Sequence, residues 1–259
     1  MTAPERSDIP PPLKTDIERV SLAVKAYLYG LSFIVKDTAR DSAFVSSHLL
    51  APLSQDLLQS TMALPMLVTE GMWSVARREL RYILEASIKQ AVVQQARYNE
   101  SIPTKLNEFK ALLNSPSISC KNRLEINLIP IEKRTLFLEE LGKLYGAASD
   151  YVHLTEKQVR AIIAAVAEGH TAGFESPQES AAASLLIAKT LAASLVLLFH
   201  SVPSYVAGDF FVSPDGESPK WFFERSTYLA EIDSYFDYKH ERKLAIAQIV
   251  EDRKAKVEF

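Results

Sequence analysis

The chain has 259 residues, of which 47% are hydrophobic and 24% charged, a composition typical of a globular protein with one large core or two small ones. Its net charge of −3 excludes a global positive field that would attract nucleic acid or an anionic membrane. The single cysteine, Cys120, excludes an internal disulfide framework and fits a reducing cytoplasm.

The amino-terminal third predicts a lead-in followed by helices. Residues 1–13 are rich in proline and lack the basic start and apolar core of a secretory signal, so we expect a flexible lead-in. Apolar residues then recur at spacings of three and four, which predicts amphipathic helices over 14–35 and 41–62. The best-defined helix is expected over 65–98, with Pro65 in its first turn.

The rest of the chain continues this pattern, because its glycines and prolines gather between periodic stretches. The expected elements are a helix over 103–114, a brief extended piece at 124–128, helices over 131–153, 155–169 and 177–201, a short strand at 210–212 and a helical close over 221–257. These elements predict an all-α fold: a bundle of about seven or eight helices with little or no strand. We expect a single domain over 14–259, with a core over 65–200 and a C-terminal helix over 221–257 that docks on the body or on a second subunit.

One segment raises the question of a membrane. Residues 181–199 are about as long as a bilayer span and carry one charge, Lys189. Six alanines and two serines lower the hydrophobicity of the segment, and a lysine near its middle is costly in lipid. We therefore expect a buried core helix and no membrane partner.

A charged pair lies at the edge of the apolar side of the 65–98 helix. At about 100° per residue, Leu84, Ile88 and Val92 fall within about 60° of Arg81, and Glu85 lies beside them. Burying either charge alone is expensive, and a pair four residues apart offsets part of that cost. Guanidinium hydrogens remain, so we expect a further partner for Arg81.

The stretch "LYGAASDYVH" offers that partner. Tyr145, Ser149 and His153 are four residues apart and share a helical face. Gly142 and Gly146 complete a stripe of small residues, and each costs about 1 kcal/mol relative to alanine in a helix. A closely approaching helix, subunit or ligand would explain this stripe.

We predict that the 65–98 and 131–153 helices pack antiparallel. This packing brings the Arg81–Glu85 pair near Tyr145, Ser149 and His153. A histidine can act as general acid or base, an arginine can hold a phosphate and a hydroxyl can orient it, which suits metal-independent RNA cleavage. The structural alternative is a satisfied ion pair at the core edge, with the remaining polar groups hydrogen-bonded at a helix end.

The pairing of "RRELRYILEAS" with "LYGAASDYVH" resembles a group of bacterial helical proteins regarded as related to the HEPN superfamily. The resemblance covers roughly residues 65–155. It implies a helical bundle, commonly dimeric, and members that include RNases and toxins of bacterial conflict systems. The nuclease signature of that superfamily, an arginine followed a few residues later by a histidine, is absent here, since Gly146 to Val152 include no arginine. Arg81 would have to supply that group from another helix.

Other polar patterns are weaker. Asp233, Asp237, His240 and Glu241 could share a helical face, for which we expect a solvated surface and no metal. The other histidines, His48, His170 and His200, stand alone, and His200 is most simply buried or capping. No glycine-rich phosphate loop occurs, so we expect no cofactor.

Three functions remain open at the level of sequence. The preferred one is a non-catalytic bundle that acts through self-association, as a dimer, or through a protein partner, in bacterial defence or stress response. The second is a HEPN-like metal-independent ribonuclease or toxin with His153 and Arg81 as catalytic residues and Glu85, Tyr145 and Ser149 in support; RNA is a partner only in this case. The third is a small-molecule pocket beside Gly142 and Gly146.

Overall fold

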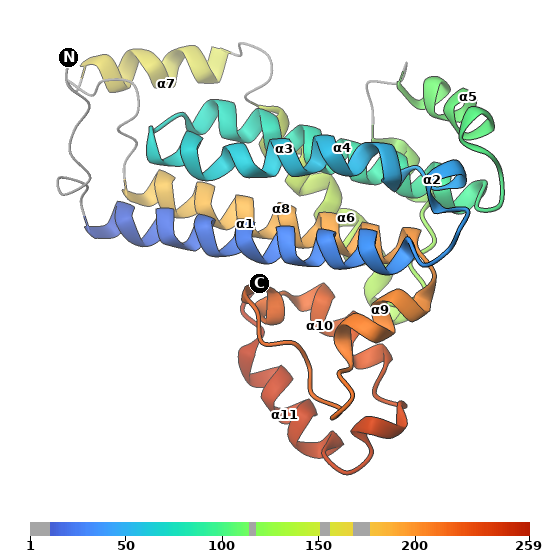
Figure 1. Cartoon of the computed structure of the whole chain (residues 1–259). Coiled ribbons are helices and arrows are strands. Elements are labelled where there is room, and N and C mark those ends of the chain that lie inside the picture. Colours follow the sequence, from blue (N-terminus) through green and yellow to red (C-terminus); the bar gives the residue numbers. More distant parts are fainter. Residues whose placement is uncertain (1–10, 114–117, 151–155, 168–176) are drawn as a thin grey trace.

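The computed structural model describes residues 11–113, 118–150, 156–167 and 177–259, and all regular structure in these ranges is helical (Figure 1). The α-helices are α1 (Pro11–Thr38), α2 (Phe44–Ser47), α3 (Leu50–Thr69), α4 (Trp73–Ala96), α5 (Ile102–Leu113), α6 (Ile131–Ser149), α7 (Glu156–Ala167), α8 (Pro177–Ser201), α9 (Ser204–Phe211), α10 (Thr227–Tyr235) and α11 (Ile246–Lys256). Short 3-10 helices are η2 (Ser119–Arg123), η3 (Phe222–Arg225) and η4 (His240–Arg242). The all-α prediction is confirmed. The described α-helices outnumber the seven or eight expected, because the 41–62 and 221–257 segments each divide and α9 forms in the connection that follows α8.

The boundary between α3 and α4 differs from the prediction. Pro65 lies inside α3 and does not begin a helix, and the chain turns later, at Gly71 with φ of 69°. The amide of Met72 donates to Leu67 O at 2.6 Å, which satisfies a carbonyl at the helix end. Only glycine adopts this left-handed conformation without strain, so Gly71 and not Pro65 sets the break.

The two predicted extended pieces do not form strands. Residues 124–128 are irregular, and side chains take the place of a neighbouring strand: Gln95 bonds both the amide and the carbonyl of Glu125 at 2.9 Å, and Leu128 N donates to His200 Nε2 at 3.1 Å. Alternation correctly indicated which residues are buried. At 210–212, the aromatic residues Phe210 and Phe211 instead form the last turn of α9.

Helices α1, α3, α4 and α8 form a four-helix bundle that runs the length of the molecule (Figure 1). Hydrogen bonds fix the register of α1 on α8: Ser180 and Ser184 donate to Asp16 at 2.7 and 3.1 Å, and Tyr27 bonds Ser194 at 2.9 Å. Residue numbers rise together along both helices, so α1 and α8 are parallel.

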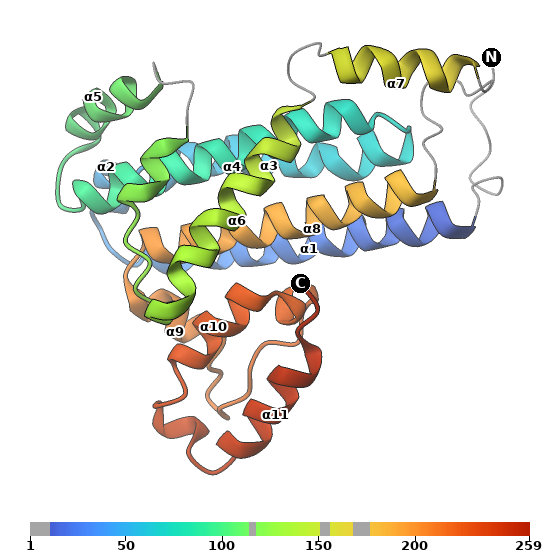
Figure 2. The ribbon, with the colours of Figure 1, turned by 180° about the vertical axis from the view of Figure 1, so that it is seen from behind.

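The same argument places α4 parallel to α8. Ser87 bonds Ser194 at 2.7 Å, and Gln90 donates to Ser201 at 3.2 Å. Helix α3 runs against its neighbours, and the chain therefore travels from the end of α4 back to the start of α8 through α5, α6 and α7 (Figure 2).

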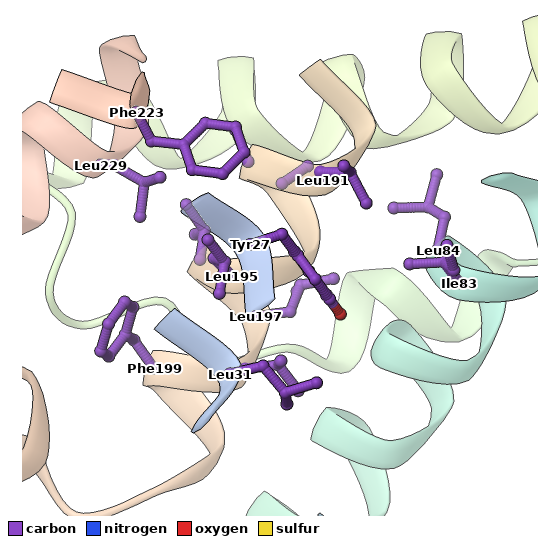
Figure 3. Close-up of a cluster of buried hydrophobic side chains, with 14 of the residues drawn as sticks. Tyr27, Leu31, Ile83, Leu84, Leu191, Leu195, Leu197, Phe199, Phe223 and Leu229 are labelled. Carbon is purple, nitrogen blue, oxygen red and sulfur yellow. The ribbon is translucent and has the colours of Figure 1, made fainter. Parts of the chain in front are cut away.

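Helix α8 is the centre of the bundle. Figure 3 shows Leu191 and Leu195 of α8 among buried side chains that include Tyr27 of α1 and Leu84 of α4. By length and composition α8 is the one helix in the described ranges that could cross a membrane, and 78% of its most apolar window is buried inside the structure. The core also includes Val20 of α1, so it extends beyond the expected 65–200.

Residues 212–259 form a C-terminal unit below the bundle (Figures 1 and 2). The single docking helix expected over 221–257 is instead η3, α10, η4 and α11. Phe223 and Leu229 reach the core cluster from η3 and α10 (Figure 3), and Lys133 of α6 pairs with Glu231. Helix α11 lies on the outer side of the unit, and none of its residues is fully buried.

Candidate functional site

Arg81 and Tyr145 meet where α6 crosses α4. Nη2 of Arg81 donates to the Tyr145 hydroxyl at 3.1 Å, and the guanidinium carbon lies 5.2 Å from the centre of the tyrosine ring. The guanidinium therefore gains both a hydrogen bond and a cation–π contact. The structure brings these two predicted site residues together through the expected contact of α4 with α6.

Glu85 lies between two cations. Its carboxylate is 3.7 Å from Nε of Arg81 and 2.5 Å from Nζ of Lys89, and the Lys89 side chain is 2% exposed. Sequence reasoning missed Lys89, although a row of residues 81, 85 and 89 at spacings of four was visible in the sequence. The buried Nε of Arg81 has no hydrogen-bond partner, because 3.7 Å is too long for a hydrogen bond.

No element of the described chain lies closely against the small-residue stripe of α6. A Cβ on Gly142 would lie 3.7 Å from Lys121 Cε, an ordinary contact, and a Cβ on Gly146 would meet no atom of the described chain within 4 Å. Of the three explanations for the stripe, a closely approaching helix of the described chain is excluded, while a second subunit or a ligand stays a prediction. The Ser149 hydroxyl donates to Tyr145 O at 2.7 Å, within its own helix.

His153 lies outside the described residues, as does His170. Helix α6 ends at Ser149, four residues short of the predicted end at 153. The structure therefore gives no distance between His153 and Arg81. The described part of the cluster is one carboxylate, two cations and a phenol, an arrangement that holds α6 on α4 and leaves one guanidinium N–H for a further acceptor.

His48 and His200 are structural. Nε2 of His48 donates to Ser201 O at 3.0 Å while its Nδ1 accepts from Leu50 N at 3.1 Å. Nδ1 of His200 donates to Val196 O at 2.7 Å while its Nε2 accepts from Leu128 N. Burial lowers the pKa of each imidazole to about 4, because the charged form loses its hydration. Protonation would also remove the hydrogen bond that the accepting nitrogen receives. His200 is half-buried, and its two ring nitrogens bond the preceding turn of α8 and the 124–128 segment.

The acidic candidates of the C-terminal unit bind arginines. Arg242, fully buried, donates to Asp233 at 2.5 Å and to Asp237 at 2.9 Å, and Arg253 pairs with the same carboxylates at 2.6 and 2.7 Å. The expectation of a solvated surface is wrong for Asp233, which is 5% exposed. His240 is exposed and pairs with neither carboxylate in the described structure.

A cavity of about 230 Å³ opens beside this network, between the 215–221 loop, α10 and α11. Its apolar wall includes Trp221, Phe223, Leu229 and Ile249. The lining comes from four separate segments, namely Phe211, 215–224, 229–233 and 245–256, and sequence reasoning gave no signal for it. This cavity is not the small-molecule pocket expected beside Gly142 and Gly146, because its lining includes neither glycine.

No family model, curated protein or solved structure matches this chain.

Proposed function

We propose that the protein is a non-catalytic helical bundle that acts by self-association, and that two copies dimerise through α7 and the outer face of α3. The observation that carries this proposal is the apolar side of α7. Val159, Ile163 and Val166 recur at helical spacing on one face and are 37, 63 and 68% exposed. Exposed apolar faces of this kind are typical of interaction sites.

Helix α7 needs such a surface. It has 12 residues, and helices of about 12–15 residues or fewer are marginal in water without tertiary packing. In both ribbon views α7 stands apart from the bundle (Figures 1 and 2). Its folding is therefore coupled to the burial of its apolar side.

The outer face of α3 is the surface that fits. Met62 and Met66 lie one turn apart and are 57 and 67% exposed, and Met72 follows them at 49%. Methionine side chains are unbranched and adapt to an incoming helix. A twofold dimer in which each copy receives the α7 of the other buries both apolar faces at once, which is the reason we choose a second copy as the occupant.

The HEPN resemblance agrees with this proposal, since it implies a bundle that is commonly dimeric. We extend the proposal to a HEPN-like core around α4 and α6 and to a cytoplasmic setting, which the single half-buried Cys120 suits.

The test is the mass of the full chain in solution, by light scattering after gel filtration, across protein concentrations. We expect a dimer for the wild type and a monomer for Ile163→Glu and for Met66→Glu. Ala164→Glu is the matched control, because Ala164 is exposed but lies about 100° round the helix from Ile163. A monomeric wild type contradicts the proposal, and so does an Ile163→Glu variant that stays dimeric.

Ribonuclease activity is the second candidate, and one observation favours it: Nε of Arg81 is buried beside Tyr145 without an acceptor, where a phosphate oxygen could bind. Labelled single-stranded RNA incubated with wild type, Arg81→Lys, His153→Ala and the exposed control His240→Ala separates the two functions. Under self-association alone all four leave the RNA intact. Under the second candidate, wild type and His240→Ala cut it and the other two do not.

A further inference from the structure

We propose that the cavity of the C-terminal unit binds a small organic cation with an apolar body. This site is independent of the dimer proposed above, since α7 and α3 contribute nothing to its lining. The inference follows from three properties of the cavity: a fixed wall, an interior in which the charges cancel, and an acidic rim.

The wall is held in place before any ligand arrives. The 213–217 turn closes on itself, with Ser213 N donating to Glu217 O at 3.1 Å and Gly216 N to Ser213 O at 2.8 Å. Trp221 packs edge-on against Phe210 and Phe223, with ring centres 4.8 and 5.3 Å away. A preformed apolar wall lowers the entropic cost of binding.

The buried charges at the base of the cavity cancel. Asp233 and Asp237 are matched by Arg242 and Arg253, and Ser218 adds two hydrogen bonds to Asp233 at 3.1 and 3.0 Å. Their donors and acceptors are directed at one another. The base therefore presents little net charge to a ligand, and the rim determines whether the cavity attracts a cation or an anion.

The rim carries four carboxylates and two ammonium groups. Lys256 pairs with Glu224 at 3.1 Å and Lys220 with Glu217 at 3.4 Å. The remaining acidic side chains are Asp215 and Asp252.

Asp215 and Asp252 differ in their hydrogen-bond partners. Ser213 and the Glu217 amide hold Asp215, and their hydrogen bonds lower its pKa. Asp252 accepts from Gln248 at 2.6 Å and has no cation within 4 Å in the described structure. Asp252 is thus a carboxylate at the mouth of an apolar cavity without a paired cation, and a cationic ligand would supply that partner.

Size restricts the ligand further. A volume of about 230 Å³ is below the range of about 300–1,000 Å³ that drug-sized ligands occupy. A single ring or short aliphatic body with one amine fits this limit, with the body against Trp221 and the amine at Asp252.

Isothermal titration with three probes of one shape tests the sign of the charge: phenethylamine, 2-phenylethanol and phenylacetate. We expect the amine to bind most tightly and phenylacetate most weakly. Asp252→Asn should weaken binding of the amine about 3- to 5-fold, the effect of one exposed charge pair. Glu251→Gln is the matched control, because Glu251 neighbours Asp252 on α11 but pairs with Lys254 outside the cavity.

A second pair of variants tests the place of binding. Ala245, the residue before α11, lines the cavity and is exposed, so Ala245→Trp should fill the mouth and weaken amine binding more than about 10-fold. Ala247→Trp, in the first turn of α11 and outside the lining, should not. Equal affinity for the three probes, binding of none of them at millimolar concentration, or amine binding that survives Ala245→Trp would each overturn the proposal. Circular dichroism of both variants verifies that the unit stays folded.

Discussion

The bundle and the C-terminal unit use polar groups in different ways. In the bundle, buried polar side chains are mostly hydroxyls, such as the chain from Tyr27 through Ser194 to Ser87, which ends on the Ile83 carbonyl at 2.8 Å. They add hydrogen bonds between helices whose apolar faces already fit. In the C-terminal unit, the buried guanidinium of Arg242 bonds Phe211 O at 2.7 Å and Asp233 O at 2.8 Å as well as two carboxylates.

The difference follows from what each region can bury. Helices of 20 to 28 residues present continuous apolar stripes, and the bundle closes around them. The C-terminal unit has short helices and long connections with many main-chain carbonyls, and α11 buries no residue completely. The buried guanidinium of Arg242 donates hydrogen bonds to several of those carbonyls. Loss of a single contact should therefore matter more in this unit than in the bundle.

The largest expected effect is that of Arg242→Ala. It removes the partner of the buried Asp233, and breaking a buried ion pair on one side costs about 3–5 kcal/mol. Urea unfolding followed by circular dichroism and tryptophan emission measures the loss, with Trp221 reporting on the C-terminal unit. Arg225→Ala is the control: its pair with Glu258 is half exposed, so the loss should stay below about 1 kcal/mol. Equal losses for the two variants would show that the buried pairs of Arg242 stabilise the C-terminal unit no more than an exposed pair does.

Two glycine substitutions should give the next largest difference. Gly216 has φ of 83°, and a Cβ there would lie 2.2 Å from the Glu241 carbonyl oxygen, so Gly216→Ala should cost about 2–3 kcal/mol. A Cβ on Gly30 of α1 would lie 3.0 Å from Leu195 Cδ2, the end of a buried side chain that must shift slightly to make room. The gain of about 1 kcal/mol in helix propensity offsets that shift, so Gly30→Ala should stay within about 1 kcal/mol of wild type. Thermal unfolding compares the pair, and a larger loss at Gly30 would contradict the comparison.

At acid pH the bundle should lose more stability than the C-terminal unit. The reason is that His48 and His200, the two histidines with a lowered pKa, belong to the bundle or to its contacts. Their pKa is about 4 when folded and about 6.5 when unfolded, so the unfolded chain takes up protons first. Their contribution is complete above about pH 6.5 and is lost as the pH falls towards 4, with about 2 kcal/mol lost per histidine by pH 5.

His200→Gln tests this pH dependence. The fall in unfolding free energy between pH 7 and 5 should shrink by about 2 kcal/mol in the variant. His240→Gln, which changes an exposed imidazole, should keep the slope of the wild type. An unchanged slope in His200→Gln would show that His200 is not neutral in the folded chain.

Sequence reasoning worked where the information lies within one helix. The predicted limits of α8, 177–201, are those observed, because Pro177 and a long apolar run define them. The meeting of Arg81 with Tyr145 was predicted from the helical faces of both residues together with the proposed packing of their two helices. The break at Gly71 was missed because a proline six residues earlier is also a start signal, and only the turn geometry distinguishes the two.

The features that sequence reasoning missed depend on segments that meet through turns. Asp233 and Asp237 were read as one helical face, but α10 ends at Tyr235, and η4 then brings Arg242 back across it. Arg253 arrives from another helix, 16 and 20 positions away from its two carboxylates. No periodicity connects such residues, so neither the arginine network nor the cavity beside it could be read from spacing.

The central helix of the bundle, α8, is also its last helix in the chain, and this order has a consequence for synthesis on the ribosome. The polypeptide emerges from its amino end, so α1, α3 and α4 leave the exit tunnel well before residues 177–201 are translated. Until then, Tyr27, Leu84 and their neighbours lack the helix that covers them. The nascent protein thus exposes an open apolar trough during elongation, and chaperones that shield such surfaces are expected to act on it until the last bundle helix is released.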